Sequence, residues 1–305
     1  MEVVVTGAAG FVGRRLIKGL SDHSVVALDR AKPNIDFARA VVGDLCLQSV
    51  LNSAVSKNCD AIVHLATVPG GAAEDDPRAA WSVNMDGTAA LVDALISRGV
   101  GKRFVFASSI AVFGDLDGGV VNDDTPVRPT MLYGAHKAMA EQWLATRSRR
   151  EELNSISLRL PGIVARPAAP SGMKSAFMSD VFHAALAGVH FTMPVSPSAT
   201  IWLMSVGTIA RNLRHALEFD GPFPEPFAVT LPAVRTSVEK LVEEIAAQTG
   251  RGTDFVSYEP DETLECLFGR LPPLKAKRAE NLGFVADASL GALVEDSIRN
   301  IRSDL

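Results

Sequence analysis

Short apolar runs alternate with amphipathic stretches through the first half of the chain. The runs that have the length and content of buried parallel strands are residues 3–5, 24–28, 104–107 and 155–158. Stretches such as the one holding Leu16, Ile17 and Leu20 have the spacing of a helix with one apolar face. Strands that alternate with helices predict an α/β fold built on a doubly wound parallel sheet.

The pattern changes after Pro161. Proline, glycine and serine crowd residues 166–172, which predicts a loop between two lobes. Helices are expected over 175–186, 206–219, 238–245 and 290–298, and strands over 189–193, 200–204 and 227–231. We therefore expect a nucleotide-binding domain over residues 1–165 and a small α+β substrate lobe over 166–305, with segments such as 200–219 returning to the first domain.

A glycine-rich segment joins the first predicted strand to the first predicted helix. Residues 6–13 read Thr-Gly-Ala-Ala-Gly-Phe-Val-Gly. The first glycine permits a tight turn, the second lets the backbone approach a pyrophosphate, and the third lets the helix pack close to the strand. A turn that needs glycine for backbone reasons alone is the alternative, which the flanking strand and helix disfavour. The segment predicts a Rossmann-type site with contacts from Gly7, Ala9, Gly10, Phe11, Val12 and Gly13.

The second predicted strand ends in Asp29, where a carboxylate can accept hydrogen bonds from the adenosine ribose and repel a 2′-phosphate. This favours NAD over NADP. Arg30 is the opposing signal, because a guanidinium there can tolerate a phosphate. Asp44 and Leu45 are candidate adenine contacts, with a strand-end or helix-capping role as the alternative for Asp44.

Tyr133 and Lys137 are spaced by one helical turn, so their side chains project from the same face. A free phenol has a pKa of about 10 and is a weak base at neutral pH. A lysine cation held nearby favours the phenolate and lowers that pKa. The pair predicts a general base for a hydroxyl proton, although a solvated helix surface can show the same spacing by chance.

Together these segments resemble the extended short-chain dehydrogenase/reductase family. The matching elements are residues 6–13, Asp29, His64-Leu65-Ala66, Asn84-Met85-Asp86-Gly87-Thr88, Ser108-Ser109 and Tyr133-Gly134-Ala135-His136-Lys137. The resemblance implies a sheet that binds NAD(P) and a smaller C-terminal region that covers the substrate.

The resemblance also implies a role for each matching residue. Ser109 matches the catalytic hydroxyl that binds the reacting oxygen, and Ser108 is its support or a cofactor contact. Tyr133 matches the proton acceptor, while Lys137 lowers its pKa and holds the nicotinamide ribose. Further implied cofactor contacts are Leu65, Ala66, Thr67, Asn84, Pro161 and Ile163, with a capping or core amide as the alternative for Asn84.

Residues 201–207 lack the arginine and both acids that nucleotide-sugar members of the family usually carry there. The loop 69–77, the run 159–167 and residues 201–205 resemble instead the D-erythronate dehydrogenase group, whose members oxidise a small sugar acid at C2 with NAD. A nucleotide-sugar epimerase or dehydratase with retained NAD is one alternative. A non-catalytic NAD(P)-sensing regulator is another, which the presence of Tyr133 and Lys137 disfavours.

A sugar-acid carboxylate needs compensation when water is excluded. Arg166 and Lys174, with Ser171 and Ser175 as neutral donors, are the candidates, and exposed loop charges are the alternative reading. Trp202 is a pocket wall or a core aromatic.

Composition and charge disfavour several classes of partner and site. The chain has 305 residues, of which 47 % are hydrophobic and 21 % charged, as in globular proteins. A net charge of -5 disfavours nucleic acid and anionic membranes as partners. Three scattered cysteines give no zinc spacing, and His64 and His136 are expected to be structural, so no metal is expected. No charged leader precedes an apolar stretch, which favours the cytoplasm. Family members commonly form dimers, so a homodimer is one expected arrangement.

Overall fold

The computed structural model describes residues 1–33, 35–116, 118–167 and 174–304. Their backbone contacts divide the chain into two compact units. The first unit comprises Met1–Gly114, Val127–Leu160 and Ala210–Thr230, and the second comprises Asp115–Pro126, Pro161–Ile209 and Leu231–Leu305.

The first unit contains a parallel sheet and the helices that connect its strands. Its strands are β1 (Glu2–Thr6), β2 (Ser24–Asp29), β3 (Arg39–Val42), β4 (Cys59–His64), β5 (Lys102–Ser109), β7 (Leu153–Leu160) and β11 (Ala228–Thr230). Its helices are α1 (Phe11–Lys18), α2 (Gln48–Ala54), α3 (Gly70–Asp75), α4 (Pro77–Trp81), η1 (Ser82–Gly87), α5 (Thr88–Ile96), η2 (Ile110–Phe113), α6 (Leu132–Arg149) and most of α8 (Val206–Glu218).

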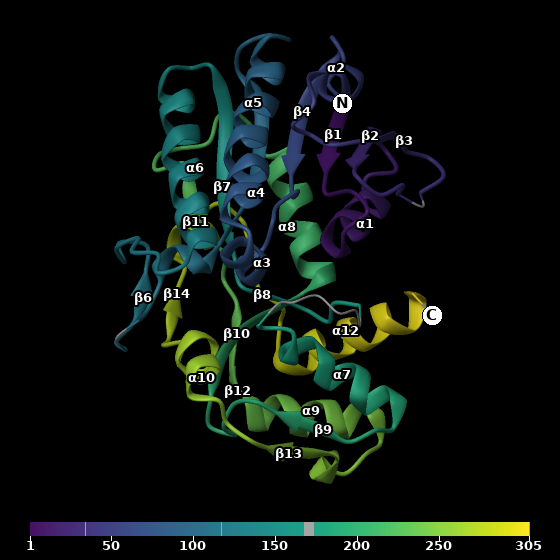
Figure 1. Ribbon diagram of the computed structural model, residues 1–305, viewed down its shortest axis with the longest axis vertical. Coiled ribbons are helices and arrows are strands. Elements are labelled where there is room, and N and C mark those ends of the chain that lie inside the picture. The colour runs from purple at the N-terminus through teal and green to yellow at the C-terminus, as the bar shows by residue number, and fades with distance from the viewer. Residues whose placement is uncertain (34, 117, 168–173, 305) are drawn as a thin grey trace. The chain divides into compact units, whose positions relative to one another are not determined.

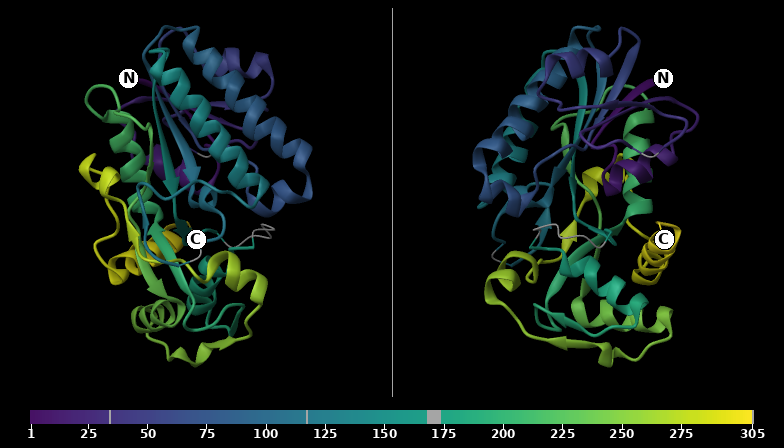
Figure 2. Two further views of the ribbon diagram at one scale, coloured as in Figure 1. Left: turned by 90° about the vertical axis from the view of Figure 1, so that its left-hand side faces the viewer. Right: turned by 45° about the vertical axis from the view of Figure 1, so that its right-hand side comes forward.

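The seven strands lie in the order β11-β7-β5-β4-β1-β2-β3, and all neighbouring pairs are parallel. Strands β1, β2 and β3 are added toward one side of the sheet, and β4, β5, β7 and β11 toward the other, so the order of connection reverses between β1 and β4. Sheets of this kind bind ligands at such a point, at the carboxyl ends of their strands. Helices α4, α5 and α6 run along one face (Figure 1), and α8 from Ala210 onward runs along the other (Figure 2). The expected doubly wound α/β fold is confirmed.

Apolar side chains from both sides of these layers form the core of the first unit. Val4, Ile62 and Phe104 come from the sheet, and Leu91 and Leu144 come from α5 and α6. All five are fully buried. This packing fixes α6 against β5, the strand that ends in Ser109.

The second unit has smaller sheets and its own apolar core. Its strands are β6 (Val121–Asn122), β8 (Gly162–Val164), β9 (Phe191–Met193), β10 (Thr200–Ser205), β12 (Val234–Ser237), β13 (Val256–Tyr258) and β14 (Leu274–Lys275). Its helices are α7 (Phe177–Ala187), α9 (Val238–Thr249), η3 (Thr253–Phe255), α10 (Glu262–Phe268), α11 (Lys277–Asn281) and α12 (Leu290–Asp304). The sheets are β12-β10-β8, β13-β9 and β14-β6, and the core gathers side chains of α7, α9 and α12.

The helix expected from Ser175 begins at Phe177, and the strand expected from Val189 begins at Phe191. Gly188 adopts φ 74° and ends α7, while the Val189 N–H donates to the Ala184 carbonyl. Val189 therefore belongs to the helix cap, because this bond satisfies a carbonyl of the last helical turn. The other expected helices and strands of this region are present, and α9 and α12 continue to Thr249 and Asp304, beyond the apolar residues that predicted them.

The start of α8 is held by two acids from the C-terminal segment. Asp287 accepts hydrogen bonds from the Ser205 N–H at 2.8 Å and from the hydroxyls of Ser205 and Thr208 at 2.6 Å each. Asp296 on α12 accepts from the Gly207 N–H at 3.0 Å. Both carboxylates satisfy donors at a helix N-terminus, where a negative charge is also favoured by the helix dipole.

In the described part of the chain, none of the helices combines the length and apolar character that a bilayer span requires.

Replacing Asp287 with alanine should remove three hydrogen bonds from the start of α8. We expect the free energy of unfolding to fall by roughly 1–3 kcal/mol. Urea denaturation of Asp287→Ala beside Asp254→Ala, which truncates an exposed acid, measures the difference. Equal stability of the two variants would contradict this capping role.

Candidate active site

A threonine and a histidine connect the carboxyl ends of β1 and β4, the two strands between which the order of connection reverses. Thr6 on β1 and His64 on β4 are neighbours in the sheet, and Thr6 Oγ1 lies 2.6 Å from His64 Nδ1. His64 Nε2 lies 2.9 Å from the hydroxyl of Thr88. Burial lowers the pKa of His64 to about 3, with a smaller contribution from the Lys137 charge. His64 is therefore neutral near pH 7 and has the structural role that the sequence predicts.

The glycine-rich loop follows β1 and has almost no room for side chains. Gly7 adopts φ 67°, a conformation that favours glycine. A Cβ added to Gly13 would lie 2.2 Å from the Gly7 carbonyl oxygen, and one added to Gly10 would lie 3.0 Å from the same atom. Gly13 therefore lets α1 begin directly against the loop. A cradle of this kind leaves backbone amides accessible to a phosphate.

Asp29 fixes the middle of this loop from the end of β2. One carboxylate oxygen accepts from the Ala9 N–H at 3.0 Å, and the other accepts from the Ala31 N–H at 2.9 Å. Each carboxylate oxygen retains further acceptor capacity. Asp29 can thus hold the loop and accept from a ribose hydroxyl at once, with Arg30 exposed beside it.

The other residues predicted for the nucleotide lie on neighbouring segments. Asp44 accepts from the Cys46 N–H at 2.9 Å, which lowers the pKa of Asp44. This bond closes a local turn, which matches the strand-end role given as the alternative for Asp44. Leu45 beside it is buried. The N–H groups of Leu65 and Ala66 both donate to Thr6 Oγ1 at 3.2 Å.

Tyr133 and Lys137 lie on one face of α6, as predicted. Lys137 Nζ lies 5.6 Å from the centroid of the Tyr133 ring and 4.5 Å from that of Phe106 on β5. The lysine is only 3 % exposed. Burial lowers the pKa of Lys137 to about 7, and the Glu141 carboxylate acts in the opposite sense. Lys137 therefore loses its proton at a much lower pH than an ordinary lysine.

The two serines at the end of β5 have different surroundings. Ser109 is half-buried, and its Oγ accepts from the Ala111 N–H at 3.1 Å as the cap of η2. Ser108 is buried, and its hydroxyl donates to Glu141 Oε1 at 2.5 Å. Of the two roles that the sequence left open for Ser108, this contact matches the supporting one.

Glu141 and Arg159 are part of this arrangement and were missed in the sequence analysis. Arg159 on β7 binds both oxygens of Glu141, with Nε at 3.0 and 3.2 Å and Nη2 at 2.8 Å. Glu141 lies one turn beyond Lys137 on α6, so the helical spacing of Tyr133, Lys137 and Glu141 was the available signal. Nothing in the sequence names Arg159 as its partner.

Asn84 and Glu74 support the first turns of α6. Asn84 Oδ1 accepts from the Val68 N–H at 2.8 Å and from the Thr67 hydroxyl at 2.9 Å, and its amide donates to the Val68 carbonyl at 3.0 Å. These bonds match the core-amide alternative. Its Nδ2 also lies 3.4 Å from Nδ1 of His136, which is buried. Glu74 on α3 accepts from the Leu132 N–H at 2.7 Å, beside Tyr133.

The second unit carries the remaining predicted residues. Pro161 and Ile163 are buried at β8. Trp202 is 1 % exposed, and its Nε1 donates to the Pro272 carbonyl at 2.8 Å, so it occupies the core position that was its alternative. The Arg166 N–H donates to Ser179 Oγ at 3.0 Å. Lys174 is exposed and Ser175 half-buried in the turn before α7, while Ser171 lies outside the described residues.

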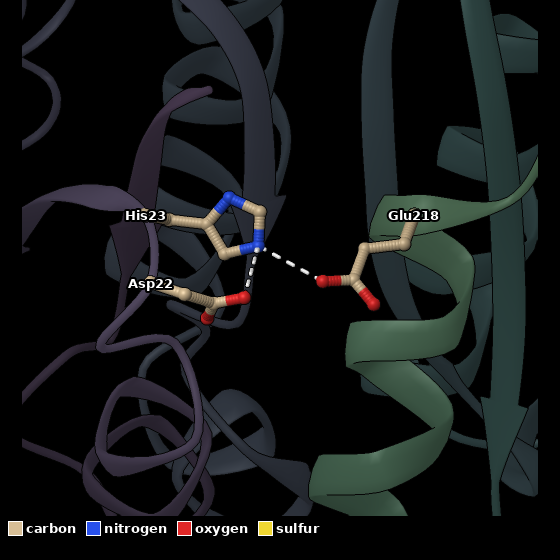
Figure 3. Close-up of side chains that lie close together, drawn as sticks. All are labelled: Asp22, His23 and Glu218. Carbon is tan, nitrogen blue, oxygen red and sulfur yellow. Dashed lines mark hydrogen bonds and ion pairs between the residues drawn. The ribbon is translucent and has the colours of Figure 1, made fainter.

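Within the described residues, Asp22, His23 and Glu218 form a group whose geometry could hold a metal ion. His23 Nε2 points toward both carboxylates (Figure 3), at 2.9 Å from Glu218 and 3.8 Å from Asp22. Arg214 Nη2 also lies 2.6 Å from Asp22 and 2.9 Å from Glu218. The guanidinium already compensates these acids, so the group is an ion-pair network that joins α8 to the loop before β2.

This geometry combines a glycine cradle, an acidic strand end and a Tyr–Lys pair whose lysine is buried, all in one unit. Residues 3–221 match the NAD dependent epimerase/dehydratase family. The chain belongs to this family. Its sequence is 33 % identical to D-erythronate dehydrogenase of Cupriavidus necator, and the alignment covers 96 % of this chain and 97 % of that protein.

Solved structures of similar sequence have the same fold. The nucleoside-diphosphate-sugar epimerase from Agrobacterium tumefaciens has a TM-score of 0.88 at 29 % identity, covering 99 % of this chain and 95 % of that one. MoeE5 in complex with UDP-glucuronic acid and NAD has a TM-score of 0.80 at 27 % identity, with all of both chains covered.

Gly13→Ala should force α1 away from the Gly7 carbonyl. We expect roughly 1–3 kcal/mol less stability, since overpacking of this size shifts the backbone, and weaker dinucleotide binding. Thermal unfolding and NAD titration check both effects. Gly19→Ala is the matched control, because its Cβ would lie 3.3 Å from its nearest neighbour at the other end of α1. A Gly13 variant as stable as the Gly19 variant would argue against the tight cradle.

Burial of Lys137 should make folding stability depend on pH. The folded pKa of Lys137 is about 7, below the ordinary 10.5. The unfolded chain therefore binds more protons between these values, and stability rises with pH across that window. We expect the gain between pH 7 and 9.5 to shrink by roughly 1–3 kcal/mol in Lys137→Met.

Denaturant titrations at the two pH values measure this difference. Lys240→Met removes an exposed lysine and should keep the wild-type pH dependence. If Lys137→Met shows the same pH dependence as wild type, the burial of this charge has no energetic consequence and the expectation is wrong.

Proposed function

We propose that the protein oxidises the C2 hydroxyl of a small sugar acid such as D-erythronate with NAD. The observation that carries the reaction class is the buried Lys137 ammonium against the Tyr133 ring on α6. The substrate class rests on the similarity to D-erythronate dehydrogenase of Cupriavidus necator, which extends over nearly the whole of both chains.

NAD fits the residues of the first unit. The glycine cradle at Gly7, Gly10 and Gly13 has no space for side chains but leaves room for a phosphate against the backbone. Asp29 has acceptor capacity for the ribose diol, and its charge would oppose a 2′-phosphate. When bound, NAD supplies the acceptor for the hydride that leaves C2.

Three side chains of the chain would perform the proton chemistry. Tyr133 takes the proton of the C2 hydroxyl, and Lys137 stabilises the phenolate that accepts it. The Ser109 hydroxyl donates a hydrogen bond to the reacting oxygen and holds it toward Tyr133. These roles need position and electrostatics, which the packing of α6 against β5 supplies.

The carboxylate of the substrate requires a cation or several donors once water is excluded. We assign this contact to Arg166, Lys174 and Ser175 at the start of the segment that leads into α7. A guanidinium fork matches both oxygens of a carboxylate, and the serine hydroxyl can add a neutral donor.

A second function is supported by the epimerase from Agrobacterium tumefaciens, whose fold matches over almost the full chain. In that case the same Tyr133 and Lys137 would act on a nucleotide sugar, and NADH would not be released. Residues 201–207 lack the arginine and acids typical of such enzymes, which favours the sugar-acid reading.

NADH absorbance distinguishes the two functions. Purified protein with NAD is assayed on D-erythronate, L-threonate and D-gluconate, beside hexuronates and UDP-sugars. NADH production with one short aldonate supports the proposal and identifies the stereochemistry. No reaction with the acids, together with conversion of a UDP-sugar without NADH release, would replace it with the epimerase function.

Tyr133→Phe should lower kcat by roughly 10²–10⁴-fold, because it removes the general base, while NAD affinity stays nearly unchanged. Tyr258→Phe is a matched control, since Tyr258 is the other of the two tyrosines and lies on β13 in the second unit. Steady-state kinetics and NAD titration measure both. Undiminished turnover in Tyr133→Phe would rule out this base.

A further inference from the structure

A chain of hydrogen bonds runs through the interior of the first unit, next to the glycine-rich loop. Its members are the side chains of Thr6, His64 and Thr88, which are 0, 1 and 2 % exposed. Thr6 ends β1, His64 ends β4, and Thr88 begins α5. The imidazole lies between the two hydroxyls, with Nδ1 2.6 Å from Thr6 and Nε2 2.9 Å from Thr88. Because these residues are buried, any effect they have on a bound nucleotide passes through their neighbours.

The Thr88 hydroxyl determines where the imidazole carries its hydrogen. A hydroxyl has one hydrogen, and a carbonyl oxygen only accepts. Thr88 therefore donates its hydrogen to the Asn84 carbonyl, which lies 2.7 Å away. In its contact with His64 the Thr88 oxygen can only accept, so His64 Nε2 carries a hydrogen.

The Thr6 hydroxyl leads to the same tautomer from the other side of the ring. Thr6 Oγ1 accepts from the N–H groups of Leu65 and Ala66 at 3.2 Å each, which occupies its two lone pairs. Its own hydrogen is then donated to His64 Nδ1. The ring is thus neutral, with Nδ1 as an acceptor and Nε2 as a donor. This agrees with the burial that lowers the pKa of His64 to about 3.

The chain of hydrogen bonds ends at a segment that packs on the glycine cradle. A Cβ added to Gly7 would lie 2.8 Å from the Ala66 nitrogen and 2.9 Å from the Leu65 carbonyl carbon. These two residues therefore form a wall of the cradle. Their amides are the ones that Thr6 Oγ1 accepts. A reoriented Thr6 hydroxyl would release these amides and let the wall shift against Gly7.

Asn84 holds the next two residues of the same segment. Its Oδ1 accepts from the Val68 N–H and the Thr67 hydroxyl, and its Nδ2 donates to the Val68 carbonyl. Asn84 lies in η1, a π-helical turn that α5 continues from Thr88 onward. Such turns are rare and often occur at functional sites. One turn therefore holds residues 65–68, through Asn84 directly and through Thr88 by way of the imidazole.

We propose that His64, as its neutral Nε2–H tautomer, is a positioning residue for NAD. It connects Thr88 to the Leu65 and Ala66 amides and thereby fixes the wall of the cradle beside Gly7. The inference rests on the proposed function, because it takes NAD as the cofactor. It extends the structural role of joining β1 to β4, since it makes the affinity for NAD depend on this buried ring.

Calorimetric titration with NAD, in the absence of substrate, tests the positioning role. Thr88→Val keeps the shape of the side chain but removes the hydroxyl that accepts from His64 Nε2. We expect NAD to bind about five- to tenfold more weakly, which corresponds to the loss of one buried hydrogen bond. Thr88→Ser restores the hydroxyl and should bind NAD as the wild type does.

Ser148→Ala is the matched control for a loss of stability alone. Ser148 on α6 and Ser155 on β7 form a buried hydroxyl pair at 2.6 Å in the same unit. Its loss should lower the melting temperature without weakening NAD binding. Wild-type affinity in Thr88→Val, or an equal weakening in Ser148→Ala, would overturn the proposal.

NMR of ¹⁵N-labelled histidine measures the tautomer near neutral pH without any ligand. The chain has six histidines, and the ring signals that disappear in His64→Gln are those of His64. We expect a protonated Nε2 and an unprotonated Nδ1. A hydrogen on Nδ1 would break the chain of hydrogen bonds at Thr6 and overturn the proposal.

Failure of the proposed function gives a different result. If the wild type binds NAD but produces no NADH with any aldonate, the substrate assignment fails, while the affinities of the Thr88 variants still decide the role of His64. If the wild type binds no NAD, the cofactor assignment and the positioning role are both overturned.

Discussion

Lys137 brings a positive charge to a position that solvent hardly reaches, and much of the first unit is arranged around that charge. The ring of Phe106 lies under its ammonium, and Glu141 follows one turn later on the same helix face. Arg159 and Ser108 then satisfy the oxygens of Glu141. A buried charge is tolerated only when its neighbours are charged or polar in the right places, so these residues form one interdependent set.

The parallel sheet explains why this set lies beside a nucleotide loop. All strands of the sheet point the same way, so β1, β4 and β5 deliver their last residues to one edge. Thr6 and His64 join two of these strand ends, and the Thr6 hydroxyl also receives the Leu65 and Ala66 amides. The loop at Gly7 therefore starts from a rigid base, which suits a site that must position a cofactor closely.

In the second unit, too, polar groups are satisfied by side chains from a distant part of the sequence. Asp287 and Asp296 come from the C-terminal segment and cap the start of α8. One fold can serve different substrates, so similarity in fold to the Agrobacterium tumefaciens epimerase is compatible with a different substrate.

The sequence by itself determined the parallel α/β fold, the glycine cradle, the position of Asp29 at a strand end and the Tyr133–Lys137 face. Each of these depends on periodicity or on turn geometry within a few residues, which local sequence specifies. It left open whether Ser108 supports the site, whether Asn84 is a core amide and whether Trp202 is buried, because burial depends on residues distant in the chain. Only the tertiary structure decided that Arg159 pairs with Glu141, since strand order alone brings β7 beside β5 and places both against α6.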